Sequence, residues 1–491
     1  MVSNGTDNSF LATRQGKLVL ALVCLAAFLD VIDTTIVNVA LPSIREHIHF
    51  TVQSLQWIAS GYLLTYGGCL LLGGRAADLL GRRRLFVAGT LLFGASSLAC
   101  GLAGSEGVLI GARLAQGLGA AMMTPAALSI LTTSFPEGTD RTKAIGLWSA
   151  TIPLGAVIGV LAGGVLAQGA GWRWVFFVNL PVCAVVLAGA FRLLDNDGRK
   201  APIKDFDVVG AVLSTVGVLG IVYALVNAPT VGWGSVRTIG ELVGAIAVLG
   251  LFIVTELRHR NPLFPLSIFR IKGLAAANAA QVIAQAGFYS MFFFITLYMQ
   301  NVLGFSPIEA GAAYVPVTIG VGMSAGISSK LLPRTGSRAI IMAGALIGAV
   351  GVFWLAQIPV RGSYIADVLP GLVVMALGLG AIFVGVQTAA NAGVPADKAG
   401  LAAALGTASG QLGSALGLAI FTAIATSHTQ HLLTQHATRA TTLTSGFHHA
   451  LVACSIFLVA ASVIASRASN SRPQMPTVEP LTEPAMLAEV A

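Results

Sequence analysis

The stretch KLVLALVCLAAFLDVIDTTIVNVAL, residues 17–41, decides the fold. A helix needs about 20 mostly apolar residues to cross a bilayer, and this stretch is long enough. Thirteen similar runs follow, near 54–74, 84–103, 107–131, 143–167, 173–193, 208–226, 237–256, 275–300, 308–332, 338–358, 364–388, 399–426 and 447–466. Each run must be helical, because backbone amides find no water in hydrocarbon. The sequence therefore predicts an all-α polytopic membrane protein with fourteen transmembrane helices.

The composition agrees with a membrane protein. Of the 491 residues 55% are hydrophobic and only 10% are charged, whereas soluble domains carry roughly 25% charged residues. The net charge of +8 does not indicate nucleic-acid binding, because the charges lie in short clusters between apolar runs. The five cysteines fall inside apolar runs without metal-ligand spacing, so neither a disulfide framework, a metal site nor a cofactor is expected.

The basic residues predict the orientation. Lys and Arg concentrate in alternate loops, for example at 82–84 and 199–204, while the other loops hold few. The positive-inside rule then places both termini in the cytoplasm. We therefore expect a multi-pass protein of the cell membrane, that is, the inner or cytoplasmic membrane.

The span count suggests a division into two halves. We expect a cytoplasmic N-terminus (1–16), a six-helix bundle (17–193), an inserted helical pair with cytoplasmic linkers (194–274), a second six-helix bundle (275–466) and a disordered cytoplasmic tail (467–491). Transporters built from two such bundles place their substrate between them, near the bilayer midplane.

Three charged residues lie inside predicted spans, where charge is costly and usually functional. Asp30 and Asp33 are three residues apart on one helix face. Two carboxylates so close together and away from water do not both ionise readily, so the pair could take up and release a proton. Arg113 stays charged and must meet a carboxylate, backbone carbonyls or water. Structural roles remain open for Asp30, as a neutral hydrogen-bonding group, and for Arg113, as a tie between helices.

Several segments together resemble one family. The run LDVIDTTIVNVALPSI (29–44) resembles the first-span signature of the fourteen-span drug:proton antiporters (multidrug efflux permeases) of the major facilitator superfamily. Further similar segments follow in the family's order: GGRAADLLGRRRL (73–85), IGARLAQGLGAAMMTPAAL (110–128), GAVIGVLAGG (155–164), GWRWVFFVNLPV (171–182) and LYMQNVLGFSPIEAG (297–311). The resemblance implies the major facilitator fold: two six-helix bundles plus an inserted two-helix hairpin.

The resemblance also implies roles for particular residues. Arg113 would act in proton transfer, where it would work with the carboxylates inferred above, Asp33 and Asp30. Asp30 is an additional carboxylate that departs from the family's usual pattern. The conformational motifs would comprise Gly74, Asp78, Gly81, Arg82 and Arg83 in the cytoplasmic loop, and Gly155, Gly159, Gly163 and Gly164 in the fifth span. Asp78 could cap a neighbouring helix or pair with Arg82, although a basic loop that only sets topology is the alternative. The glycines recur every four residues and permit close helix approach, which helix packing alone would also explain. At Val160 the family usually has proline, so the fifth helix is expected to be straighter.

A cavity for apolar cargo needs hydrophobic walls and a few polar contacts. The ninth span offers Gln281, Gln285 and Tyr289 at successive helical turns, with Phe292 nearby. Residues from other spans could complete the cavity: Trp148, Met123, Tyr314 and Gln387. The alternative for each is packing against lipid or another helix.

These features predict a proton-coupled antiporter that exports small, mostly hydrophobic drugs or antibiotics by alternating access. A proton-linked transporter of one metabolite or secreted natural product on the same fold is the alternative. No phosphate-binding GxxxxGK[ST] loop occurs, so protons and not ATP are the expected energy source. A further alternative is a transporter-like sensor or a membrane enzyme, but the sequence shows no nucleophile–base pair that would support it. The expected partners are a small-molecule substrate, protons and the lipid bilayer.

Overall fold

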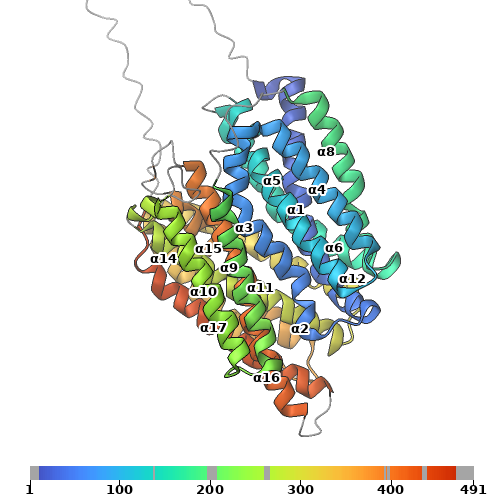
Figure 1. The fold of residues 1–491 in the computed structure, drawn as a ribbon. Coiled ribbons are helices and arrows are strands. Elements are labelled where there is room, and N and C mark those ends of the chain that lie inside the picture. The colour runs from blue at the N-terminus through green and yellow to red at the C-terminus, as the bar shows by residue number, and fades with distance from the viewer. Residues whose placement is uncertain are drawn as a thin grey trace, which may run out of the picture.

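The computed structural model describes residues 10–135, 139–195, 207–258, 266–271, 273–391, 394, 399–433 and 439–471. Over these residues the chain forms helices and contains no strand (Figure 1). The prediction of an all-α protein is confirmed.

The N-terminal half consists of long helices with two short ones at the connections. Its elements are η1 (Phe10–Ala12), α1 (Arg14–Ile48), α2 (Val52–Leu55), α3 (Trp57–Leu80), α4 (Arg82–Leu102), α5 (Glu106–Ser134), α6 (Thr139–Gly169), α7 (Trp174–Phe177) and α8 (Asn179–Leu193). α6 runs without a break past Val160, as expected from the missing proline.

The inserted hairpin and the C-terminal half follow. Their elements are α9 (Val208–Val231), α10 (Val236–Arg258), η3 (Leu266–Arg270), α11 (Leu274–Asn301), α12 (Pro307–Ala312), α13 (Val315–Thr335), α14 (Ser337–Leu355), η4 (Tyr364–Val368), α15 (Leu369–Asn391), α16 (Ala399–Leu433) and α17 (Arg439–Ala465). The predicted span 308–332 is thus two helices, α12 and α13. Pro316, which lacks an N–H, lies in the first turn of α13 and suits the start of a new helix there.

Thirteen helical segments of the described chain are long and apolar enough to cross a membrane. The remaining predicted span, 143–167, lies in α6, whose apolar segment Leu154–Gly169 is shorter than the others. Fourteen spans are therefore not fully confirmed.

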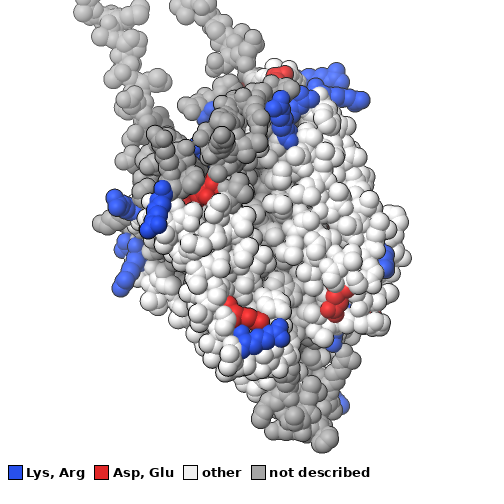
Figure 2. All heavy atoms as spheres, viewed as in Figure 1, with Lys and Arg blue, Asp and Glu red and all other residues white. Residues whose placement is uncertain are grey.

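The outer surface is apolar, as lipid requires. α10 packs mainly on α9 and exposes Val236 (90%), Leu257 (68%) and Ile246 (61%). Figure 2 shows a broad uncharged centre on this face, with most visible Lys and Arg towards its upper and left margins. Water would penalise this surface, whereas hydrocarbon accepts it.

The two halves meet along α3 and α16 and, at the end where α1 finishes, along α6 and α12. α9 packs against both α3 and α16, so the inserted hairpin contacts both halves. A methyl group on Gly67 of α3 would collide with Gln411 of α16. The helices therefore approach closely at that point.

The start of the predicted disordered tail is held in place. Ser337 Oγ donates to the Ser469 carbonyl (2.9 Å), and Arg338 donates to the Ala468 carbonyl through Nε (3.0 Å) and Nη2 (2.9 Å). Residues 467–471 thus cover the start of α14, and 472–491 lie outside the described residues.

Candidate functional site

α1 brings the two acids into the protein interior. The helix begins after Thr13, whose hydroxyl accepts from the Gly16 amide (2.9 Å), and ends at His49 in a left-handed conformation. Asp33 is fully buried and Asp30 is 8% exposed. Since the residues are three apart, both side chains leave the same side of α1, as predicted.

Asp33 forms a buried ion pair with Arg113 of α5. Arg113 Nη1 lies 2.5 Å from Asp33 Oδ2, and both side chains are at most 1% exposed. Arg113 Nε also donates to the Ile58 carbonyl at 2.8 Å. Arg113 therefore finds both a carboxylate and a backbone carbonyl, two of the partners that the sequence left open.

Two amides complete the surroundings of Asp33. Gln116 Nε2 (2.8 Å) and Asn179 Nδ2 (2.7 Å) both donate to Asp33 Oδ1. Gln116 Oε1 accepts from Arg113 Nη1 at 2.8 Å, and Asn179 Nδ2 also donates to Ser97 Oγ at 3.0 Å. Sequence reasoning quoted Asn179 within a motif but gave it no role.

Asp30 has a separate set of partners on α3. The Tyr62 hydroxyl donates to its Oδ1, and the Tyr66 hydroxyl donates to its Oδ2 at 2.9 Å. Both tyrosines are at most 2% exposed. Sequence reasoning missed them, although two tyrosines one helical turn apart inside a span were a usable signal.

Tyr62 connects the two groups. Its ring faces Arg113, with the guanidinium carbon 4.3 Å from the ring centroid. Five helices, α1, α3, α4, α5 and α8, thus join through one network of buried polar side chains. Such a network is favourable only while every member keeps its partners.

The glycines of α6 lie at helix contacts. A methyl group on Gly155, Gly159 or Gly163 would meet residues of α1, whereas one on Gly164 would meet Ile308 of α12, in the other half. The stripe therefore packs α6 onto the helix that carries the acids and, at Gly164, onto the opposite half.

The loop motif forms the turn between α3 and α4. Gly81 has a φ of 101°, which glycine adopts at least cost, and Arg82 begins α4. Arg83 Nη2 donates to the Phe191 carbonyl of α8 at 3.0 Å. Gly74 approaches Pro125 of α5. The predicted Asp78–Arg82 pair stays a prediction, because the Asp78 side chain lies outside the described part of the chain.

Some of the predicted cavity residues come together on α11. Phe292 lies 5.4 Å from Tyr314 between ring centroids, and the Tyr314 hydroxyl donates to the Phe292 carbonyl at 3.1 Å. Tyr289 is partly buried and packs against two hydrophobic clusters, each of which contains residues of both halves. Gln281 and Gln285 border Gly410 of α16. α11 also contacts α1 of the other half, where Gln300 Nε2 donates to the Val39 carbonyl at 2.9 Å.

Other predicted cavity residues lie elsewhere. Met123 is fully buried in the N-terminal core, where the α5 backbone at this residue borders Gly89 of α4. This conformation therefore leaves Met123 no surface for cargo. Trp148 is half-buried against the N-terminal core, and Gln387 is partly buried on α15. Met123 and Trp148 thus lie with the N-terminal core.

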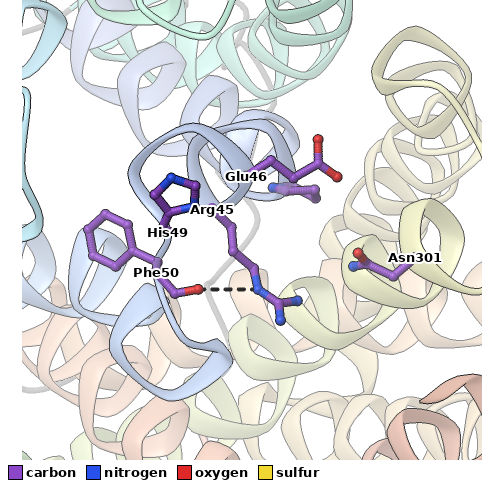
Figure 3. Close-up of a pocket in the computed structure, with 6 residues that line it drawn as sticks. Arg45, Glu46, His49, Phe50 and Asn301 are labelled. Carbon is purple, nitrogen blue, oxygen red and sulfur yellow. Dashed lines mark hydrogen bonds between the residues drawn. The ribbon is translucent and has the colours of Figure 1, made fainter.

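A pocket of about 290 Å³ lies where α1 ends, lined by Pro42, Arg45, Glu46, His49, Phe50 and Asn301. In Figure 3, Arg45 Nε donates a hydrogen bond to the Phe50 carbonyl (3.3 Å), and Asn301 of α11 lies across the pocket from Arg45. This pocket contains none of the predicted cargo residues.

Comparisons with known proteins agree with this architecture. The puromycin resistance protein pur8 of Streptomyces alboniger is 36% identical over 443 residues, which cover 90% of this chain and 88% of that protein. The cephamycin export protein CmcT of Amycolatopsis lactamdurans is 36% identical over 458 residues, 92% of each chain.

Solved structures show the same fold. A bacterial homolog of the human lysosomal transporter Spinster, inward-facing and occupied, matches with a TM-score of 0.64 and 19% identity, over 95% of this chain and 100% of that chain. A D-xylose-proton symporter matches with a TM-score of 0.62 and 13% identity, over 92% and 98%. The model of the Major Facilitator Superfamily matches residues 23–418. This multi-pass membrane protein therefore belongs to the Major Facilitator Superfamily.

Proposed function

We propose that the protein exports small, mostly hydrophobic drugs or antibiotics across the cytoplasmic membrane in exchange for protons. Relatives named for puromycin resistance and cephamycin export support the direction and the class of cargo. Both termini would lie in the cytoplasm, in keeping with the distribution of basic residues.

The observation that carries proton coupling is the pair of acids buried on one membrane-spanning helix. Asp33 is fully buried and Asp30 almost so. Burying a carboxylate in a spanning helix is costly, and such groups mark ion pathways and proton relays. Arg113 lies close enough to respond to a change in the charge of Asp33.

Alternating access would work by separating and rejoining the two halves. The contacts of α6 with α12 close one end of the interface. The half-buried face of α11 around Gln285, Tyr289 and Phe292 would contact cargo, because it combines aromatic with amide groups on a helix that contacts α1 of the other half.

A second candidate is export of one natural product made by the producing cell. Relatives are named for single compounds, including cephamycin and tetracenomycin C. A narrow cargo range would favour this reading, and a broad range would favour multidrug export.

Susceptibility tests in an efflux-deficient host, with and without the protein, measure the range of cargo. Inside-out vesicles then test the energy source: uptake of a protected compound should collapse with an uncoupler and ignore ATP. Uptake that requires ATP, or that survives the uncoupler, would contradict the proposal.

A further inference from the structure

The two buried acids differ in the chemistry of their partners. Within the described chain, the hydrogen-bond partners of the Asp33 carboxylate are one arginine nitrogen and two amide nitrogens. These groups donate hydrogen bonds and cannot accept them. An ionised Asp33 satisfies all three donors, whereas a protonated Asp33 would set its own O–H against a donor. Arg113 would then also lose its counter-charge.

Asp30 has partners that serve either protonation state. Tyr62 and Tyr66 contact it through hydroxyl groups, and a phenol hydroxyl both donates and accepts. With Asp30 ionised, both hydroxyls donate to the carboxylate. With Asp30 protonated, one hydroxyl can rotate and accept the carboxyl hydrogen. Asp30 can therefore gain and lose a proton and keep a hydrogen bond to each tyrosine in both states.

Access to water also separates the two acids. Asp33 has no exposed surface, while Asp30 retains 8% exposure. The titratable and charged groups that act on Asp30 within the described chain are Tyr62, Tyr66, Asp33 and Arg113. Only the first two touch Asp30 directly.

A change at Asp30 would reach the interface between the halves. Tyr66 is adjacent in sequence to Gly67, where α3 and α16 approach closely. Tyr62 connects Asp30 to Arg113 through its ring. Reorienting these hydroxyls would act on the helix that packs against the opposite half.

We infer that Asp30, in its tyrosine cage, is the group that binds and releases the transported proton, while Asp33 remains the permanent counter-ion of Arg113. The inference rests on the proposed function and assigns its proton step. Proton binding forms the Asp30 O–H bond, and release breaks it to water on the opposite side of the membrane.

The test uses the full chain in liposomes with puromycin and ethidium as probes. Each variant is measured twice: by accumulation driven by an acidic lumen, and by exchange of labelled for unlabelled probe at equal pH. Asp30→Asn imitates the protonated form, so accumulation should be lost while exchange continues. Asp33→Asn leaves Arg113 without a counter-ion, so both should be lost.

Two results with the acid variants would overturn the inference. One is accumulation by Asp30→Asn as in the wild type. The other is an Asp33→Asn variant that keeps exchange and loses only accumulation, since that would make Asp33 the proton site. If the wild type exchanges no probe or accumulates none, the proposed function fails, and the inference fails with it.

Variants that keep the acid guard against misfolding. In Tyr66→Phe one hydroxyl is lost, so the pH dependence of accumulation should shift. Tyr298→Phe is the matched control, because it removes a buried tyrosine hydroxyl that donates to the Pro359 carbonyl in the C-terminal half. An unshifted Tyr66→Phe profile, or an equal shift in the control, would contradict a proton site at Asp30.

Discussion

The guanidinium of Arg113 lies over the ring of Tyr62, with its central carbon 4.3 Å from the ring centroid. The hydroxyl group of Tyr62 donates a hydrogen bond to Asp30, and the guanidinium of Arg113 forms an ion pair with Asp33. The two acids of α1 are thus joined through two side chains from other helices. A perturbation at either acid should be felt at the other.

Replacing Tyr62 separates its two roles. Tyr62→Phe removes the hydroxyl and keeps the ring over Arg113, whereas Tyr62→Leu removes both. A desolvated cation–π contact is worth about 2 kcal/mol, so Tyr62→Leu should be less thermally stable than Tyr62→Phe. Thermal unfolding of purified protein in detergent measures the difference. Equal stability of the two variants would show that the ring contact contributes nothing.

Neutralising Asp33 should destabilise the protein through Arg113. Breaking a buried ion pair by removing one partner costs roughly 3–5 kcal/mol, because the other charge stays buried. The double variant Asp33→Asn/Arg113→Gln removes both charges and should be more stable than Asp33→Asn alone. Thermal unfolding of Asp33→Asn, Arg113→Gln and the double variant gives the coupling free energy between the two side chains. Additive losses would mean that the 2.5 Å pair is energetically unimportant.

Arg113→Lys keeps the charge and loses the planar fork. Arg113 donates to Asp33, Gln116 and the Ile58 carbonyl from two different nitrogens, which a single ammonium cannot reproduce. Each hydrogen bond of a charged group contributes about 1.5–3 kcal/mol, so transport should fall sharply. Vesicle uptake is the measurement.

The matched control for Arg113→Lys is Arg237→Lys. Arg237 forms an exposed pair with Glu241 one helical turn away, and exposed pairs contribute little. Uptake by the Arg237→Lys variant should therefore equal uptake by the wild type. Full uptake by Arg113→Lys would show that transport needs only the positive charge of Arg113 and not its planar guanidinium.

Gly164→Ala should hinder closure of the halves. A methyl carbon on Gly164 would lie 2.6 Å from Ile308 Cα of α12, and such overpacking costs about 1–3 kcal/mol. Transport should fall, while Gly169→Ala, which has open space around it, should transport normally. Equal transport by the two variants would show that the α6–α12 contact does not limit the cycle.

The sequence predicts the helices far better than their contacts. Apolar runs and basic loops indicate where spans lie, because lipid imposes length and composition. They do not reveal the interruption between α12 and α13, which depends on local geometry around Ala313 and Tyr314. They also do not reveal that Met123 lies in a helix contact, since an adaptable apolar side chain suits a core and a cavity equally.

The candidate site shows the same limit. Charged residues in spans single out Asp30, Asp33 and Arg113, because burying them needs a reason. Their pairing joins positions 80 residues apart, and helical periodicity does not determine which faces of separate helices meet. Asn179 and Tyr62 carry no charge, so only the packed structure identifies them as partners.

Accumulation of a protected compound in liposomes under an imposed pH gradient tests the central claim most directly. Wild-type protein should concentrate the compound when the lumen is acidic and stop when an uncoupler removes the gradient. Asp30→Asn, compared in the same liposomes, should not concentrate it at all. Accumulation that does not depend on the gradient would contradict proton exchange through this site. Accumulation that persists unchanged when both acids of α1 are replaced would contradict it too.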